Sequence, residues 1–268
     1  MGADAGPVVP GPRRVRPEAE GFDRVADRYE RGRPEYPAEA VARLVGALRL
    51  GPSARVVDLG AGTGKLTRAL RLAGLRPIAV EPGAGMRAEF VRHFPDVELH
   101  EGTAESLPFD DASVDAVVCG QSFHWFDVAR AAAEIARVLR PSGGLALVWN
   151  RRDERVPWVA DLTRVLDRRS GAAPRVRDAA WREPLESSRL FDPLEQEIVE
   201  HTQTLTHDVL VDRVLSVSFI ALLPPHEQAA VVAEVDTLLA TSPATRDRST
   251  IVLPYRTEVY WTRRRRTP

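Results

Sequence analysis

The chain has 268 residues, of which 44% are hydrophobic and 28% are charged, so it carries enough apolar material for a globular core. A formal net charge of −1 argues against a general electrostatic attraction to nucleic acid or to anionic membranes. Cys119 is the only cysteine, which argues against a disulfide framework and a thiolate metal cluster.

No segment has the roughly 18 uncharged apolar residues that a membrane helix needs. The first residues include Asp4 and lack the apolar core of a secretory signal. We therefore expect a soluble, cytoplasmic protein. Its length suits one α/β domain with an elaboration, or a core with a small second lobe.

Residues 1–20 are rich in Pro, Gly, Ala and Arg and show no periodicity, which predicts a disordered tail. Helical spacing of apolar residues follows over 22–29 and again over 38–48, with prolines between the two segments. We predict that these two helices form an N-terminal lid.

Residues 54–150 alternate between short apolar, β-branched runs and amphipathic segments. The pattern predicts strands at 54–60, 76–82, 97–104, 114–122 and 143–150 and helices at 65–73, 85–94 and 128–139. Nearly continuous apolar strands between helices are typical of a parallel sheet covered on both faces. We therefore predict an α/β, Rossmann-like doubly wound fold, in which ligands lie at the carboxyl ends of the strands.

The character of the sequence changes after Asn150. Residues 195–205 alternate like an edge strand, residues 208–240 form an apolar helical insertion, and residues 251–264 alternate again. These segments predict a seven-stranded sheet whose last strand is antiparallel, with an inserted helical lid above the pocket.

The run VVDLGAGTGK, residues 56–65, is an apolar strand that leads into a glycine-rich turn and a helix. Such a turn directs backbone N–H groups at a polar ligand, and glycine permits its close approach. A phosphate-binding P-loop requires G-x-x-x-x-G-K-[ST], but Leu59 and Leu66 occupy two of the required positions. A dinucleotide fingerprint requires G-x-G-x-x-G, and Lys65 stands where its third glycine belongs. The P-loop interpretation fails, and the nicotinamide interpretation is weakened.

The acidic residue Asp58 followed by G-x-G-x-G resembles the first motif of the class I S-adenosylmethionine-dependent methyltransferases, within the methyltransferase type 11 domain. Glu81 at the end of the second strand and the segments 101–126 and 136–150 match later motifs of this family in the same order. Within it, RPEYP near the start and FHWFD after the fourth strand resemble the small-molecule branch that contains trans-aconitate methyltransferase. The resemblance covers residues 22–150 well.

The resemblance implies S-adenosyl-L-methionine as cofactor, with S-adenosyl-L-homocysteine as its product. Residues 21–150 would then hold the lid helices and the cofactor-binding core, and residues 151–268 the substrate cap helices and the closing antiparallel strands of the same domain. The cofactor-binding residues that it implies are Asp58, Gly60, Ala61, Gly62, Glu81, Met86, Thr103, Ala104, Glu105, Gln121, Tyr29 and Arg33.

The implied roles differ along this set. Asp58 would fix the loop or meet the amino group of the cofactor, and Glu81 would accept hydrogen bonds from the ribose hydroxyls. Met86 would help to enclose the adenine, and one residue of 103–105 would contact its exocyclic amine. Plain core packing for Met86 and a solvated side chain for Arg33 are the alternative interpretations.

His124, after the fourth strand, is the candidate catalytic residue. Methyl transfer rewards alignment of the acceptor with the methyl group, and a base is needed only if the acceptor arrives protonated. His124 is therefore either a general base or a wall of the pocket beside Trp125 and Phe126.

The predicted partner is a small organic acceptor, with a carboxylate or a hydroxyl favoured, and no nucleic acid, membrane or metal is expected. The sequence does not reveal the oligomeric state. Two alternative functions stay open at this point: a catalytically silent S-adenosylmethionine-binding regulatory protein, and a nicotinamide-dependent oxidoreductase.

Overall fold

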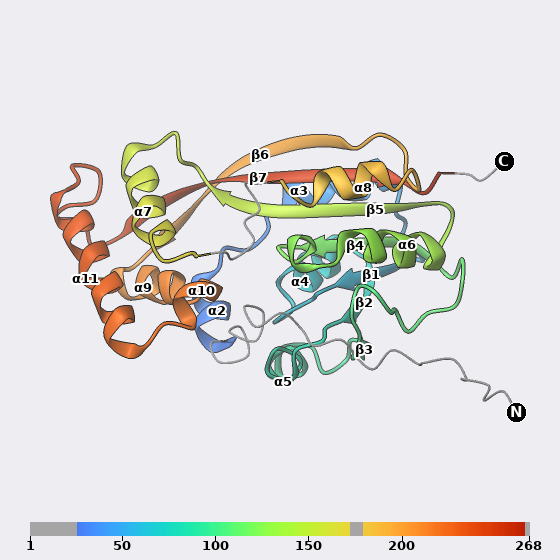
Figure 1. Ribbon diagram of the computed structural model, residues 1–268, viewed down its shortest axis with the longest axis horizontal. Helices are drawn as coiled ribbons and strands as arrows, with labels where there is room; N and C mark the ends of the chain where they lie inside the picture. The colour runs from blue at the N-terminus through green and yellow to red at the C-terminus, as the bar shows by residue number, and fades with distance from the viewer. Residues whose placement is uncertain (1–25, 172–178, 266–268) are drawn as a thin grey trace, which may run out of the picture.

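The computed structural model describes residues 26–171 and 179–265 (Figure 1). Its helices are α2 (Ala26–Gly32), α3 (Ala38–Leu48), α4 (Lys65–Leu72), α5 (Ala84–His93), α6 (Val128–Val138), α7 (Pro157–Asp167), α8 (Arg182–Ser187), α9 (His207–Leu215), α10 (Ser218–Ala221) and α11 (Pro225–Thr241), with a 3-10 turn, η1 (Phe123–Trp125). The predicted disordered tail, residues 1–20, lies outside the described residues.

Seven strands form one mixed sheet. They are β1 (Arg55–Leu59), β2 (Arg76–Val80), β3 (Leu99–His100), β4 (Val114–Gly120), β5 (Leu139–Arg152), β6 (Glu195–Leu205) and β7 (Ile251–Arg263). Their order is β3-β2-β1-β4-β5-β7-β6. The pairs from β3 to β5 are parallel, and β7 runs antiparallel to both of its neighbours. The predicted seven-stranded, doubly wound sheet with an antiparallel last strand is confirmed.

The central strands are mostly apolar because both of their faces are covered. Successive side chains of a strand point to opposite faces. Val57 of β1 therefore packs with α6 and α8 in one hydrophobic cluster. Its neighbour Val56 packs with α3 and α4 in another. This double burial explains why these strands show no alternation of polar and apolar residues.

The third strand is shorter than predicted. Only Leu99 and His100 of the expected 97–104 pair with β2, opposite Ala79 and Val80. Because β2 ends at Val80, ahead of Glu81 and Pro82, the later residues have no strand beside them. Position at the sheet edge limits β3, since an edge strand has a neighbour on one side only.

Four helices, α7, α9, α10 and α11, gather beyond the carboxyl end of β5 and are called the cap lobe here (Figure 1). β5, β6 and β7 extend into the cap lobe, where Leu253 and Tyr255 join its own apolar cluster. Helix α2 contacts α9 and connects the lobe to the start of the chain. Over residues 26–171 and 179–265, no helix combines the length and apolarity that a transmembrane span requires.

Candidate active site

The glycine turn between β1 and α4 contains three glycines with positive φ, which are +71° at Gly60, +58° at Gly62 and +93° at Gly64. A Cβ at Gly60 would lie 2.6 Å from the Ser122 Cβ, and one at Gly64 would lie 2.4 Å from Phe94 Cε2. A Cβ at Gly62 would meet no atom of the described residues within 4 Å. Gly60 and Gly64 are thus required by the packing of the protein on itself, whereas Gly62 borders open space.

The backbone donors of this turn already bond within the protein. The N–H groups of Gly60 and Ala61 donate to the Val80 carbonyl at 2.8 Å and 3.1 Å. The Gly62 N–H donates to Glu81 Oε2 at 2.9 Å. These bonds hold the turn against β2. Gly60 and Ala61 are therefore predicted to permit close approach of the cofactor and not chiefly to donate hydrogen bonds to it.

Asp58, the acidic residue before the turn, is fully buried. Its Oδ2 accepts a hydrogen bond from the Thr67 hydroxyl at 2.6 Å. Its Oδ1 has no hydrogen-bond partner. Burial, and then repulsion from Glu81, raise the pKa of Asp58 to about 7, while the bond from Thr67 opposes the shift. A buried acceptor without a partner beside an open turn suits a ligand that brings a donor, such as the amino group of S-adenosylmethionine.

Glu81 follows β2 and faces the turn from the neighbouring strand. Its Oε1 accepts from the Gly83 N–H at 2.8 Å, so its two oxygens are oriented by two backbone donors. The side chain is only 8% exposed. A carboxylate oxygen can accept more than one hydrogen bond, so the held carboxylate retains capacity for ribose hydroxyls.

The residues predicted near the adenine fall into two kinds. Met86 and Ala104 are buried, and so is Leu107, as apolar walls require. Thr103 is half-buried and forms a β-bridge with Ser106. The side chain of Glu105 accepts from the Asp127 N–H at 2.9 Å, which holds the loop before α6. One carboxylate oxygen of Glu105 is therefore already engaged, and a contact of this residue with the adenine stays a prediction.

Gln121 stands at the carboxyl end of β4 with a φ of +61°, an uncommon conformation for a residue with a side chain. Its side-chain amide donates to the Asn150 carbonyl at 3.0 Å and so joins the ends of β4 and β5. Left-handed backbone held in place by its surroundings is a feature of functional sites. Gln121 stays a predicted site residue.

His124 lies in η1, half-buried, with its ring 5.0 Å from Trp125 and 6.4 Å from Trp149 between centroids. Trp149 Nε1 donates to His124 Nδ1 at 3.3 Å. Indole is a donor only, so Nδ1 is the acceptor and the neutral ring carries its proton on Nε2.

The structure describes only one of the two N-terminal side chains predicted to contact the cofactor. Tyr29 lies in α2, and its side chain is outside the described part of the structure. Arg33 donates to the Ser216 carbonyl at 3.1 Å, at the end of α9. Arg33 thus contacts the cap lobe, and a direct contact with the cofactor stays a prediction.

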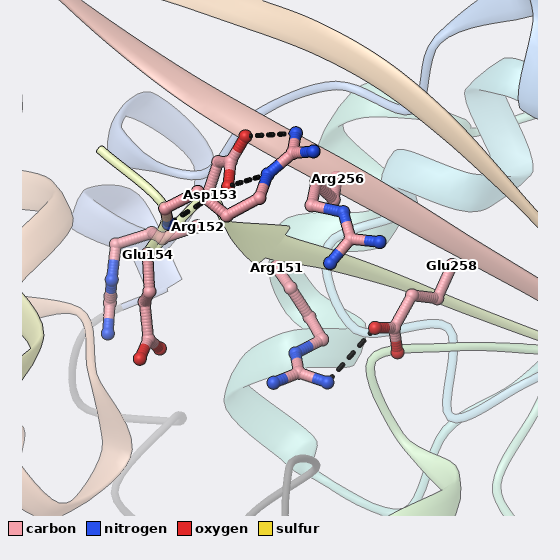
Figure 2. Close-up of a pocket in the computed structure, with 7 residues that line it drawn as sticks. Arg151, Arg152, Asp153, Glu154, Arg256 and Glu258 are labelled. Carbon is pink, nitrogen blue, oxygen red and sulfur yellow. Dashed lines mark hydrogen bonds and ion pairs between the residues drawn. The ribbon is translucent and has the colours of Figure 1, made fainter. Parts of the chain in front are cut away.

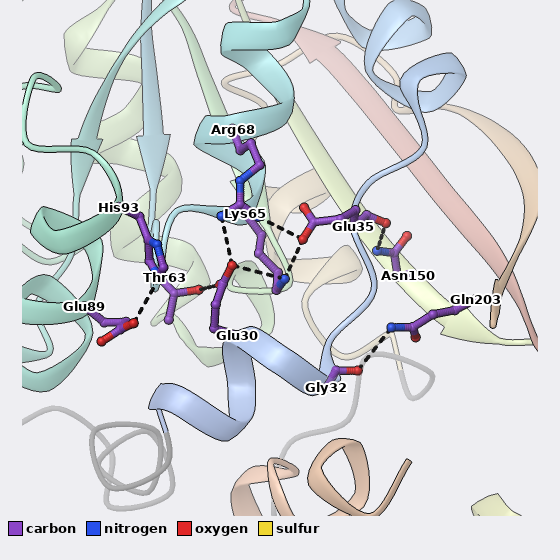
Figure 3. Close-up of polar contacts among 10 residues, drawn as sticks. All are labelled: Glu30, Gly32, Glu35, Thr63, Lys65, Arg68, Glu89, His93, Asn150 and Gln203. Atoms are coloured by element: carbon purple, nitrogen blue, oxygen red, sulfur yellow. Dashed lines mark hydrogen bonds and ion pairs between the residues drawn. The ribbon is translucent and has the colours of Figure 1, made fainter. Parts of the chain in front are cut away.

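A charged cluster that was not predicted from the sequence joins α2 to the start of α4 (Figure 3). Glu30 accepts from the Thr63 hydroxyl at 2.7 Å and from Arg68 at 2.9 Å. Lys65 meets Glu35 at 2.6 Å and Glu30 at 3.5 Å. The one available signal was that Lys65, next to the glycine turn, is the only lysine in the chain.

An arginine-rich cavity of about 310 Å³ lies where β5 and β7 approach the cap lobe, and its lining also went unpredicted (Figure 2). The lining residues are Arg151, Arg152, Asp153, Glu154, Arg155, Arg256 and Glu258. Arg151 meets Glu258 at 3.0 Å, and Arg155 meets Asp153 at 2.6 Å. Alternating charges on an exposed strand end carry no pattern that distinguishes a cavity from a solvated surface.

Comparison with known proteins agrees with this geometry. A family model for the methyltransferase domain matches residues 57–147. A methyltransferase of Mycobacterium tuberculosis is 43% identical over 234 residues, which cover 87% of this chain and 91% of that protein. A methyltransferase-like protein of Schizosaccharomyces pombe is 37% identical over 239 residues, covering 88% and 92% of the two chains.

The fold is also shared with solved structures. The phosphoethanolamine N-methyltransferase 2 of Haemonchus contortus, in complex with phosphomonomethylethanolamine and S-adenosylhomocysteine, superposes with a TM-score of 0.57 at 15% identity, over 97% of this chain and 62% of that chain. An S-adenosylmethionine-dependent methyltransferase of Thermotoga maritima superposes with a TM-score of 0.51 at 18% identity, over 91% and 99%.

The sheet order, the glycine turn and the acidic residues on β1 and after β2 define a class I methyltransferase fold. A relative of 43% identity over nearly the whole of both chains then identifies the family. The chain belongs to the S-adenosylmethionine-dependent methyltransferases.

Proposed function

We propose that this protein binds S-adenosylmethionine at the glycine turn and methylates a small organic acceptor through a carboxylate or a hydroxyl. The observation that carries the proposal is the buried, unpartnered Oδ1 of Asp58 beside the open space at Gly62. An acceptor atom without a partner in a dry site is costly unless a ligand supplies the donor.

Each of these residues would contact a different part of the cofactor. Asp58 would accept from the amino group, and Glu81, oriented by two backbone N–H groups, would accept from the ribose hydroxyls. The buried side chains of Met86, Ala104 and Leu107 would contact the apolar faces of the adenine. Gly62 leaves room for this approach because it has no Cβ.

The bound sulfonium supplies an activated methyl group, so the protein has mainly to align the acceptor and to exclude water. The hydrogen bond from Trp149 favours one role for His124 over the other. With Nδ1 accepting from the indole, the neutral imidazole presents Nε2–H, which donates to an acceptor oxygen and does not remove a proton. His124 would therefore position the acceptor, and an acceptor that arrives ionised, such as a carboxylate, needs no base.

Calorimetric titration of S-adenosylhomocysteine into the wild type, Glu81→Ala and Glu98→Ala tests the cofactor site. Glu98 is an exposed residue beside β3 whose carboxylate bonds His100, so its variant controls for the loss of one negative charge. We expect tight binding by the wild type and by Glu98→Ala. Glu81→Ala should lose about 1.5–3 kcal/mol, the scale of hydrogen bonds to a charged group.

NADH and ATP serve as ligand controls in the same titrations. Binding of NADH in place of S-adenosylhomocysteine, or equal binding by wild type and Glu81→Ala, would contradict the proposed site. Transfer of a labelled methyl group is then screened over small carboxylic acids and alcohols. Transfer only to amines or thiols would contradict the proposed acceptor class.

A further inference from the structure

Two arginines from distant parts of the chain meet where β5 leaves the sheet. Arg152 is the last residue of β5 and stands opposite Tyr255 of β7 in the strand register. Arg213, on α9 of the cap lobe, donates from Nε to the Tyr255 hydroxyl at 3.4 Å. Tyr255 therefore connects one cation from the sheet with one from the cap lobe.

Neither guanidinium meets a carboxylate at ion-pair distance within residues 26–171 and 179–265. Arg213 is only 5% exposed, and its Nη1 has no hydrogen-bond partner. Arg152 is half-buried and donates from Nε to the Thr163 hydroxyl at 3.2 Å. Burial, and then the nearby Arg213, lower the pKa of Arg152 to about 10, although Tyr255, Glu154 and Asp167 oppose the shift, so the repulsion between the two arginines and the burial outweigh these groups.

Other arginines of the cap lobe are paired. Arg168 and Arg169 of the segment after α7 both bond Glu234 of α11. Arg155, just before α7, meets both Asp153 and Glu200. Among the described residues, these exposed and half-buried arginines thus have carboxylate partners, whereas the buried Arg213 forms no ion pair.

A buried charge without a counter-charge is costly, and a second like charge beside it raises the cost. Such an arrangement is retained where a ligand supplies the missing charge, since functional sites commonly keep residues that lower the stability of the fold. The planar guanidinium matches carboxylate and phosphate oxygens in particular.

We propose that Arg152 and Arg213 bind an anionic group of the methyl acceptor, a carboxylate or a phosphate, at the junction of the sheet and the cap lobe. Arg152 also lines the arginine-rich cavity (Figure 2), which gives an acceptor a route to the pair. The carbonyl of Asn150, two residues earlier on β5, accepts from Gln121, so Arg152 lies on the strand that reaches the predicted cofactor end of the sheet. This inference rests on the proposed function, because it takes the bound anion to be part of the acceptor.

The anion held by this pair serves as an anchor and is not the atom that receives the methyl group. Two guanidinium groups withdraw charge from an oxygen that they bind and make it a poorer nucleophile. The acceptor therefore has a second polar group, such as another carboxylate or a hydroxyl, that reaches the methyl group. The acceptor class is a small molecule with an anionic end and a separate nucleophile.

Calorimetry with three small probes tests the pair, with and without saturating S-adenosylhomocysteine and at constant ionic strength. The probes are succinate, inorganic phosphate and the neutral succinamide. The proteins are the wild type, Arg213→Gln, Arg152→Gln and the control Arg248→Gln, which removes an exposed positive charge near the end of α11. We expect succinate or phosphate to bind the wild type and Arg248→Gln, and succinamide to bind neither. The preferred anion distinguishes a carboxylate anchor from a phosphate anchor.

The two test variants should bind the anion at least tenfold more weakly. Arg213→Gln should also melt several degrees higher than the wild type without ligand, because it removes an unpaired buried charge. A residue that only supports the fold would show the opposite shift. Failure of both anions to bind the wild type, or binding by Arg213→Gln and Arg152→Gln equal to that of the wild type, overturns the anion site.

The S-adenosylhomocysteine titration separates this inference from the proposed function. If S-adenosylhomocysteine binds and neither anion does, the anion site is wrong and the cofactor site stands. If the anions bind and S-adenosylhomocysteine does not, the proposed function fails, and with it the assignment of the anion to a methyl acceptor.

Discussion

The turn region around β1 and α4 and the cap lobe leave opposite charges without a partner. In the turn region the buried atom without a partner is a carboxylate oxygen, Asp58 Oδ1, and in the cap lobe it is a guanidinium nitrogen, Arg213 Nη1. S-adenosylmethionine carries an ammonium and a sulfonium, and the proposed acceptor carries an anion. Under the proposed function, the two regions would bind ligand groups of opposite charge.

Within the turn region a second contrast separates what packing requires from what a ligand requires. Gly64→Ala places a Cβ against Phe94 at a positive φ, and we expect it to lower the free energy of unfolding by about 3 kcal/mol through overpacking and strain. Gly62→Ala has the same conformational penalty without the clash, so we expect a loss of only about 1 kcal/mol.

Urea denaturation measures both losses, and calorimetry measures the affinity for S-adenosylhomocysteine. Gly62→Ala should lose tenfold or more in affinity although it is the more stable of the two variants. Normal affinity in Gly62→Ala would remove the distinction between the two glycines and would place the cofactor elsewhere.

The pH dependence of stability tests the unpartnered carboxylate. Because the pKa of Asp58 is raised to about 7, the native state keeps the proton to higher pH than the unfolded chain, whose aspartates titrate near pH 4. This contribution to stability is present in full below about pH 4 and is lost as the pH rises to 7. We expect a fall on the order of 2 kcal/mol in the free energy of unfolding of the wild type between pH 5 and pH 7, relative to Asp58→Asn.

Unfolding curves at pH 5, 6, 7 and 8 provide the measurement, and saturating S-adenosylhomocysteine provides the control. A ligand ammonium at Asp58 stabilises the ionised carboxylate and should flatten the pH dependence of the wild type. Identical pH profiles for wild type and Asp58→Asn without ligand would show that Asp58 is not the group that titrates.

A smaller effect on stability is expected in the charged cluster around Lys65, where each cation faces a carboxylate. Lys65→Gln removes the central cation between Glu30 and Glu35 but leaves Arg68 in place, so we expect a loss of roughly 1 kcal/mol in the free energy of unfolding. The matched control Arg71→Gln breaks an exposed pair with Asp96 and should lower the free energy of unfolding less than Lys65→Gln does. Equal losses in the two variants would mean that the buried position of Lys65 adds nothing to its ion pairs.

The sheet and the turn were predictable because their signals are local. A buried parallel strand is mostly apolar, as Val56, Val57 and Leu59 of β1 show, and a positive φ at a strand–helix turn selects glycine, as at Gly62. The length of β3 was not predictable, because it depends on where the neighbouring strand β2 ends.

The charged parts of the site escaped prediction for a different reason. The contact of Lys65 with Glu30 and the approach of Arg152 to Arg213 join residues far apart in the sequence, in a chain crowded with arginine. No periodicity marks such pairs. Only the fold tells a buried arginine without a carboxylate from an exposed one in solvent.

The single lysine, Lys65, allows this protein to be labelled at one side-chain amine. Since Lys65 is buried and held by two carboxylates, amine-directed reagents should modify its ε-amine slowly. Because this is the only lysine ε-amine in the chain, its labelling rate, read as a mass increment, should report how often α2 separates from α4. The rate at which this contact opens is therefore measurable in the unmodified sequence, with no engineered probe.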